Sequence, residues 1–173
     1  MSTNERPPLP EAVGFLSYLQ RYRHDRGASA KLRGALSDAR RPNAWPLLGG
    51  FPRAIGSRAF ETVAALWAGD PELAGDAGNL GDTMARLKTD NNSFEGRFKR
   101  LLICDRDEIA ERVAPLVRAA QAKGVRVNYA QLLSDLLCWS DEVKVRWAKA
   151  FWGAAEADAG INPDLLDVAE AQG

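Results

Sequence analysis

Apolar residues recur along the chain at the three- and four-residue spacing of amphipathic helices, and no segment alternates as a half-buried strand does. The clearest helical pattern lies in residues 94–152. Asp105 is expected to begin one helix with a variant of the capping box, Pro115 to kink that helix, and Gly124 to end it. Asn128 is expected to cap the next helix. The pattern predicts an all-α protein.

The N-terminal part shows the same spacing with more interruptions. Residues 11–23 have a helical pattern, which Gly27 is expected to end. A second helix is expected to begin at residue 28 or 29 and to run to residue 39, before Pro42. Gly49 and Gly50 are expected to prevent a long helix in residues 45–51. Ser57 is expected to be the N-cap of a helix that reaches residue 67.

The loop-forming residues of the segment 69–78 divide the chain into two expected halves. We expect one small helical bundle with a basic surface in residues 11–78 and a second bundle, packed against the first, in residues 79–153. The Pro-rich residues 1–10 are expected to be a flexible arm. Residues 154–173 are an acidic tail, for which the sequence leaves open a disordered segment or a short acidic helix.

Composition restricts the class of protein. Hydrophobic residues make up 46% of the 173 residues, which is too many for a disordered chain. No apolar run approaches the roughly 18 residues of a membrane span, and the N-terminus has no apolar signal segment. The two cysteines, Cys104 and Cys138, form no disulfide framework and are expected to be free and structural. We therefore expect a cytoplasmic protein with no membrane contact.

The sequence contains no recognisable catalytic or metal-binding set. His24 is the one histidine, which is too few ligands for a typical zinc site, so we expect no metal and no cofactor. Asp105, Asp107 and Glu108 could be paired carboxylates, but acids at a helix start more often stabilise the free N–H groups there. We expect no enzyme activity. A small hydrolase that uses Asp105 and Asp107 is the least favoured alternative.

Aromatic residues admit two interpretations. Tryptophans can stack on the bases of a single strand, and the chain has five of them. However, Trp67, Trp139 and Trp147 fall on apolar helical faces, so we expect these three to pack in the core.

Charge is unevenly distributed although the formal net charge is zero. Residues 1–60 hold 10 basic and four acidic residues, whereas residues 61–173 hold 13 basic and 19 acidic residues. A basic half is a possible footprint of nucleic-acid binding. The alternative is a solvated face with local ion pairs such as Glu108 with Arg112. The candidate nucleic-acid-binding residues are Lys31, Arg33, Arg40, Arg41, Arg97, Lys99, Arg100 and Arg106.

Three motifs in the C-terminal half resemble those of a known family. They are G-R-F-K-R-L-L-x-x-D-R-D at 96–107, V-N-Y-A-Q-L-L-S-D-L-L-C-W at 127–139 and R-W-A-x-x-F-W at 146–152. K-L-R at 31–33 and A-W-P-L-L at 44–48 match more loosely. Together these segments resemble the small subunit of the type I-E CRISPR Cascade complex, the CasB family. The resemblance covers most of residues 11–152.

The resemblance implies an all-helical protein of two small bundles, present as two stacked copies in Cascade. It also implies contacts with the guide RNA, with target and displaced DNA, and with the backbone and large Cascade subunits. Lys31, Arg33, Arg97 and Arg106 occupy basic positions of the family. Asp82, Asp141 and Glu142 stand where relatives can carry basic residues, so the resemblance does not transfer those contacts.

The resulting hypothesis is a non-catalytic Cascade subunit that binds nucleic-acid backbone. It would stabilise the R-loop of guide RNA and target, together with the displaced strand. Arg33, Arg97 and Arg106 are expected to bind phosphates rather than bases, because base pairing with the guide already reads the sequence. The alternative is a helical protein–protein interaction module without nucleic-acid contact.

Overall fold

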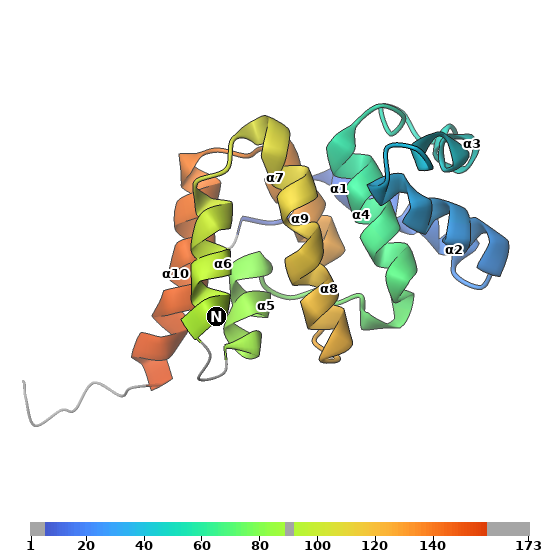
Figure 1. The fold of residues 1–173 in the computed structure, drawn as a ribbon. Coiled ribbons are helices and arrows are strands. Elements are labelled where there is room, and N and C mark those ends of the chain that lie inside the picture. Colours follow the sequence, from blue (N-terminus) through green and yellow to red (C-terminus); the bar gives the residue numbers. More distant parts are fainter. Residues whose placement is uncertain (1–5, 89–91, 159–173) are drawn as a thin grey trace, which may run out of the picture.

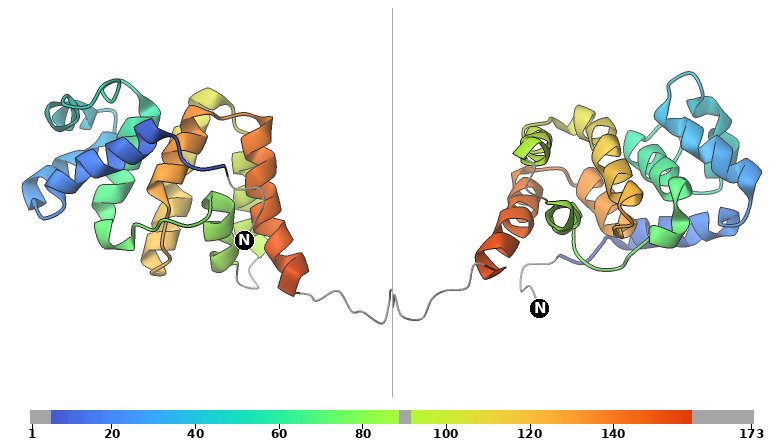
Figure 2. Two further views of the ribbon diagram at one scale, coloured as in Figure 1. Left: turned by 180° about the vertical axis from the view of Figure 1, so that it is seen from behind. Right: turned by 60° about the horizontal axis from the view of Figure 1, so that its bottom comes forward.

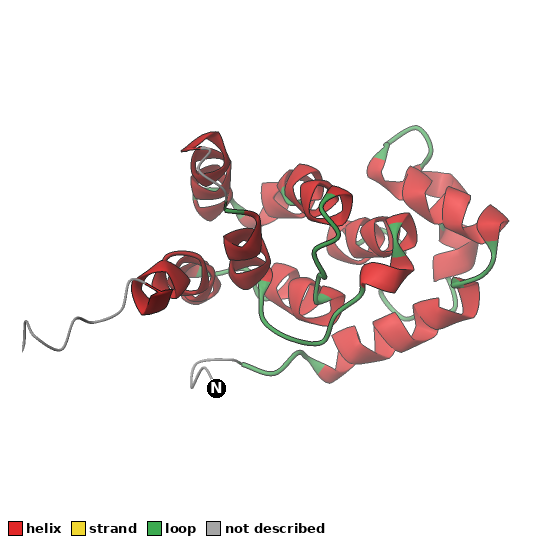
Figure 3. Cartoon of the chain, turned by 90° about the horizontal axis from the view of Figure 1, so that it is seen from below, coloured by secondary structure: helices red, strands yellow, loops and turns green. Residues whose placement is uncertain are grey.

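The computed structural model describes residues 6–88 and 92–158. Within these ranges the backbone forms helices joined by loops, and no strand is present (Figure 3). An isolated parallel bridge between Ala74 and Val127 is the one β-type pairing in the described part of the chain. The expected all-α fold is confirmed.

Four helices form the N-terminal half, which occupies the right of Figure 1. They are α1 (Pro10–Leu19), α2 (Arg26–Arg33), α3 (Trp45–Leu48) and α4 (Arg58–Gly69). Short 3₁₀ turns continue or connect them at Gln20–Tyr22, Gly34–Leu36, Arg41–Asn43 and Pro71–Leu73. The shortness of α3 agrees with the two glycines that follow it.

The boundaries expected for α2 are wrong at both ends. Asp25 is the N-cap, and its side chain accepts a hydrogen bond from the Ala28 N–H at 2.9 Å. This cap satisfies a free donor of the first turn, so Gly27 lies inside the helix instead of ending the preceding one. At the other end the helix tightens into a 3₁₀ turn after Arg33 and does not reach residue 39.

Six helices form the C-terminal half. They are α5 (Leu80–Leu87), α6 (Asn92–Leu102), α7 (Arg106–Arg112), α8 (Ala114–Ala122), α9 (Tyr129–Leu137) and α10 (Asp141–Asp158). A kink was expected at Pro115, but the helix is divided at Val113 instead. Pro115 lies in the first turn of α8, where a backbone N–H would have no partner within the helix, so its absence costs nothing. Asn128 caps α9 as expected, by accepting from the Gln131 N–H at 3.1 Å.

The expected terminal segments are only partly described. Residues 1–5 and 159–173 lie outside the described residues. Leu9, within the expected arm, donates its backbone N–H to the Ser134 hydroxyl at 2.7 Å and so joins the arm to α9. At the other end α10 continues to Asp158, which lies beyond the first residues of the expected tail.

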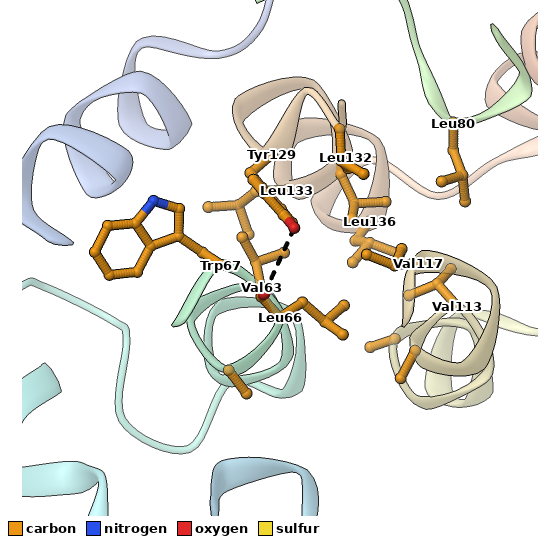
Figure 4. Packing of buried hydrophobic residues seen from close by; sticks show 14 of the residues in the cluster. Val63, Leu66, Trp67, Leu80, Val113, Val117, Tyr129, Leu132, Leu133 and Leu136 are labelled. Carbon is orange, nitrogen blue, oxygen red and sulfur yellow. Dashed lines mark hydrogen bonds between the residues drawn. The ribbon is translucent and has the colours of Figure 1, made fainter. Parts of the chain in front are cut away.

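One continuous apolar core joins the two halves. Helices α4 and α9 lie side by side at its centre, and α7 and α8 pack against α4 (Figure 4). The side chains that meet there include Val63, Leu66, Val113, Val117, Leu132, Leu133 and Leu136, all almost completely buried. Trp67, Trp139 and Trp147 are buried as expected. The division into two bundles near residue 78 stays a prediction, because the buried cluster spans both of them.

The helices are arranged with two distinct faces. Helices α2, α6 and α8 lie on the face toward the viewer in Figure 1, and α1 and α10 lie on the opposite face (Figure 2). Helix α10 packs along α5 and alongside α6, where the rings of Phe98 and Phe151 stack at 4.3 Å between centroids. The face with α2, α6 and α8 therefore contains the segments that carry most of the candidate basic residues.

Candidate nucleic-acid interface

A groove with a volume of about 760 Å³ lies between α6 and the pair α7–α8. We call it the α6–α8 groove. It is lined by Arg97, Arg100, Leu101, Ile103, Cys104, Asp107, Glu108, Glu111, Arg112, Pro115 and Leu116. Among the apolar lining residues Ile103 is 79% exposed, whereas Leu101 and Leu116 are almost completely buried. The groove thus combines an apolar lining with charged groups of both signs.

Three arginines of the groove are free to bind an anion. Arg97 and Arg100 are three residues apart on α6, which places both on one face of the helix. Arg112 of α7 joins them across the groove. None of the three forms an ion pair with a residue that the structure describes, and the suggested pair of Glu108 with Arg112 is not formed. Arg112 was missed from the sequence because only the helix packing brings it to α6.

A second set of free cations surrounds the end of α2. Lys31, Arg33 and Arg40 are exposed, and within residues 6–88 and 92–158 they have no ion-pair partner. The chain turns back after α2, so that the Cβ of Arg40 lies 3.3 Å from the position that a Cβ on Gly34 would occupy. This close approach brings Arg40 beside the residue that follows Arg33. We call these three residues the α2 cluster.

Arg58 connects the α2 cluster with the α6–α8 groove. It pairs with Asp38, which lies in the turn after α2, and with Glu111 of the groove at 3.5 Å. The hydrogen bond from Arg58 holds the pKa of Asp38 below its usual value, and the same contact raises the pKa of Arg58. The two basic sets therefore belong to one surface, joined through a charged bridge that has no signal in the sequence.

Arg41 occupies a different environment. Its guanidinium binds the Glu61 carboxylate, which has no exposed side-chain surface. The Trp45 indole N–H and the Gly56 backbone N–H donate to the same carboxylate at 2.8 and 2.9 Å. An arginine that balances a buried carboxylate has little charge left for an external anion. Arg41 therefore has a structural partner that the sequence did not show.

Lys99 and Arg106 also have partners within the chain. Lys99 pairs with Glu95 at 3.2 Å and lies 5.9 Å from the centroid of the Trp152 ring. The hydrogen bond from Lys99 lowers the pKa of Glu95. Arg106 donates to the Trp139 carbonyl at 3.4 Å and does not line the α6–α8 groove. Both residues remain exposed, but they are separate from the two sets of free cations.

The described residues show no arrangement typical of catalysis or metal binding. Residues 6–88 and 92–158 contain no group of three side chains that could hold a metal ion. Asp105 occupies the N-cap position of α7 but makes no side-chain capping bond, so the expected capping box is not formed. Asp107 lines the groove and Asp105 does not, so the two acids are not gathered at one site.

The two cysteines are free, as expected. Cys104 is buried, its thiol donates to the Arg100 carbonyl at 3.2 Å, and burial raises its pKa. Cys138 is half-buried. In the described part of the chain, no helix has the length and apolar character needed to cross a membrane.

The acidic residues that depart from the family's basic pattern have local roles. Asp82 completes a capping box at the start of α5, in which it accepts from the Asn79 N–H at 2.8 Å. Asp141 pairs with Lys144 at 3.6 Å in the first turn of α10. Asp82 and Asp141 therefore have partners within the chain, at positions where the resemblance transfers no nucleic-acid contact.

The fold and the surface define a class of protein: an all-helical scaffold with one continuous core and free cations on one face. Residues 28–152 match the family model described as CRISPR-associated protein Cse2. The chain belongs to this family. The resemblance to the Cascade small subunit that its motifs indicated is confirmed.

Individual relatives agree with this assignment. The CRISPR-associated protein Cse2 of Thermus thermophilus is 31% identical over 166 residues, which cover 83% of this chain and 91% of the relative. The crystal structure of CasB from Thermus thermophilus is similar with a TM-score of 0.65 and 30% identity, covering 82% of this chain and 97% of that one. For CasB from M. ruber the TM-score is 0.70 and the identity 27%, with coverage of 89% and 99%.

A chain of a solved CRISPR RNA-guided surveillance complex shares the fold. Its TM-score is 0.72, and the match covers 86% of this chain and 95% of that chain. At 22% identity this similarity concerns the fold alone.

Proposed function

We propose that this chain is a non-catalytic subunit of an RNA-guided antiviral DNA surveillance complex of the Cascade type. In this complex it binds nucleic-acid backbone and stabilises the R-loop of guide RNA and target, together with the displaced strand. The observation that carries the proposal is the group of free cations on one face: Lys31, Arg33, Arg40, Arg97 and Arg100 are exposed and form no ion pair within the described residues. Membership of the Cse2 family supplies the context.

The physical argument concerns what such a subunit must recognise. Base pairing between guide and target reads the sequence, so a scaffold protein needs to contact only phosphates. Arginine suits this task because its guanidinium forms paired hydrogen bonds with phosphate oxygens. Arg41, Lys99 and Arg106 stay among the proposed contacts, but their partners inside the chain reduce the positive charge that they offer.

The partners follow from the same proposal. They are the guide RNA, the target and displaced DNA strands, the backbone and large subunits of the complex, and a second copy of this chain. The subunit acts in the cytoplasm and needs no cofactor of its own.

A salt titration of target binding tests the proposal. Complexes are reconstituted with guide RNA and with either the wild-type subunit or the variant Arg33→Glu/Arg97→Glu/Arg100→Glu. The slope of log affinity against log salt changes by somewhat less than one unit for each phosphate contact. The variant removes three such contacts, so we expect its slope to be shallower by about 2. The matched control is Arg53→Glu/Lys123→Glu/Lys149→Glu, which reverses three exposed cations outside both basic sets. Equal slopes for wild type, variant and control would refute the proposal.

A protein–protein interaction module is the second candidate function. The α6–α8 groove supports it, because Asp107, Glu108 and Glu111 balance the three arginines and Ile103 is exposed. Under this alternative, the triple Glu variant would fail to assemble with the other subunits. Normal assembly together with weakened DNA binding would favour the nucleic-acid interface.

A further inference from the structure

Three side chains form a cluster at the edge of the protein where α6 and α10 lie beside the end of α5 (Figure 1). They are Trp152 of α10, which is half-buried, and the exposed lysines Lys88 and Lys99. We call them the Trp152 cluster. We propose that an unpaired base of single-stranded nucleic acid stacks on the Trp152 ring, while Lys88 and Lys99 hold the neighbouring phosphates. The inference rests on the proposed function and extends it to a site outside the α2 cluster and the α6–α8 groove.

The Trp152 ring has one side toward the core and another toward solvent. Its centroid lies 5.7 Å from that of Phe98 and 4.9 Å from that of Phe151, and both phenylalanines are almost completely buried. The Nζ atom of Lys99 lies over the ring at 5.9 Å from the centroid. The Lys99 side chain is 62% exposed, so the ring surface beneath it is reached from solvent. The indole is therefore anchored by packing and still offers a π face to a ligand.

The lysine over this ring is held only weakly. Lys99 pairs with Glu95 at 3.2 Å, an i,i+4 pair at the surface, and such pairs contribute little to stability. A base can therefore replace the ammonium over the ring, and the displaced ammonium is then available to a phosphate. The Glu95 carboxylate also accepts a hydrogen bond from the Trp152 indole N–H at 3.3 Å. This bond keeps the ring in position when Lys99 moves.

The other four tryptophans do not offer such a face. Trp45 also has a cation near its ring, the Arg41 guanidinium at 5.9 Å from the centroid. However, Arg41 is bound to the fully buried Glu61 carboxylate, so it cannot move aside at low cost. The remaining tryptophans are almost completely buried: Trp67, Trp139 and Trp147. The packing therefore singles out Trp152, for which the sequence has no signal.

The ligand class follows from the geometry of stacking. A ring can receive a base only when that base is unstacked from its own neighbours, which excludes an intact duplex and favours a single strand. Stacking accepts any of the bases, so it adds affinity without reading the sequence. This behaviour suits a subunit of a complex in which base pairing with the guide reads the sequence.

The Trp152 cluster adjoins the proposed phosphate contacts of the groove. Lys99 directly precedes Arg100, which lines the groove, so the two sites lie on neighbouring sides of α6. Lys88 forms no ion pair with a residue that the structure describes, and its Nζ atom lies over the Phe151 ring at 5.1 Å from the centroid. A strand that crosses α6 from the groove therefore reaches the Trp152 cluster.

A target whose displaced strand lacks bases tests the stacking. Complexes with guide RNA are reconstituted with wild type or with Trp152→Leu, which keeps an apolar side chain but removes the ring. Two targets share the guide-paired strand, and their unpaired displaced strands consist either of thymidines or of abasic sites. We expect Trp152→Leu to bind the thymidine target about tenfold more weakly than wild type and the abasic target equally well. Equal losses on both targets, or no loss on either, would overturn the proposal.

Two further variants separate stacking from packing. Trp152→Phe retains a ring and should recover most of the lost affinity for the thymidine target, and a failure to recover it would contradict stacking. Phe151→Leu disturbs the same packing by removing a ring that is 1% exposed, and it should not distinguish the two targets. If Phe151→Leu weakened binding to the thymidine target alone, the assignment to Trp152 would be wrong.

The arginine variant of the salt titration keeps this inference separate from the proposed function. Arg33→Glu/Arg97→Glu/Arg100→Glu should bind both targets more weakly, because abasic strands retain their phosphates. A loss with this variant but none with Trp152→Leu would overturn the stacking alone. No loss with either variant would overturn both the stacking and the proposed function.

Salt dependence distinguishes the ring from the lysines. Trp152→Leu should leave the slope of log affinity against log salt unchanged, because stacking releases no counterions. Lys88→Gln/Lys99→Gln should make the slope shallower by about 1.4 on both targets, since each contact with a single strand contributes about 0.7. A slope changed by Trp152→Leu, or unchanged by the lysine variant, would overturn the proposal.

Discussion

A buried carboxylate, that of Glu61, engages one of the predicted cations, Arg41. Glu61 lies on α4 without exposed surface, and it accepts hydrogen bonds from Arg41, Trp45 and Gly56. It holds the short helix α3 and the following loop against α4. Its partner Arg41 is therefore fixed from inside the protein, whereas Arg40, the neighbouring residue, is exposed.

The Glu61 contacts can be tested by substitution. Glu61→Ala leaves the donors of Arg41, Trp45 and Gly56 without their acceptor. Removing one partner of a buried ion pair is costly, so we expect the free energy of unfolding to fall by about 3 kcal/mol. Urea unfolding measures this loss. Glu72→Ala, which removes the exposed partner of Arg23, should cost much less. Equal losses would show that burial of Glu61 is unimportant.

Asp135 gives the stability a specific pH dependence. It is 2% exposed, and its carboxylate accepts from the Trp147 indole N–H at 2.7 Å and from Gln131 at 2.9 Å. Burial raises its pKa, although these hydrogen bonds and Arg146 oppose the effect. The folded protein therefore binds the proton of Asp135 more strongly than the unfolded chain, whose aspartate pKa is about 3.9.

This contribution is fully present below the unfolded pKa and is lost as the pH rises through the folded pKa of Asp135. We expect wild type to lose stability relative to Asp135→Asn as the pH increases from 4 to 7. Urea unfolding of both proteins across this range is the measurement. A difference that stays constant, or that moves in favour of wild type with rising pH, would contradict the raised pKa.

At the scale of helices, some helix boundaries could be predicted from capping residues and others could not. The start of α9 followed from the capping side chain of Asn128. The break near Asp105 was also predicted, although the capping bond expected there is not formed. The start of α2 did not, because the capping bond of Asp25 outweighed the helix-ending tendency of Gly27. The break between α7 and α8 lies at Val113, before Pro115, which belongs to the first turn of α8.

The packing of α5 on α10 depends on one glycine. A Cβ built on Gly81 would lie 2.1 Å from the Trp147 carbonyl oxygen, so α10 or α5 must shift to accept any side chain. We expect Gly81→Ala to lower the free energy of unfolding by about 2 kcal/mol, as overpacked cores do. Gly96→Ala on α6 is the matched control, because its Cβ meets nothing within 4 Å. The control should be neutral or stabilising by up to about 1 kcal/mol. A destabilised control, or an unaffected Gly81→Ala, would show that the close approach is not the cause.

At the scale of the whole molecule, the sequence predicted the helical class, the family and the segments that carry the cations. It could not show which cations are free, because their partners are distant in the chain: Arg41 binds Glu61, Arg106 binds the Trp139 carbonyl, and Arg58 joins Asp38 to Glu111. Spacing within one helix says nothing about such contacts. Only the packing of α6 against α7 and α8 forms a groove and adds Arg112 to it.

The same packing places the two basic sets on one face of the protein. The α2 cluster and the α6–α8 groove lie on the face that contains α2, α6 and α8, and Arg58 bridges them. A continuous apolar core fixes the two halves of the protein to each other. A strand that follows this face would therefore meet cations at fixed separations, without any need for base-specific contacts.

The most direct test of the central claim is the affinity of the reconstituted complex for two targets. Both targets carry the same guide-paired strand, but their displaced strands differ in sequence and are left unpaired. After normal assembly has been verified, wild type and Arg33→Glu/Arg97→Glu/Arg100→Glu are compared at about 0.1 M salt. If these arginines hold phosphates, the variant should bind both targets about tenfold more weakly, by the same factor. Unchanged affinity, or a loss that depends on the displaced sequence, would contradict the account.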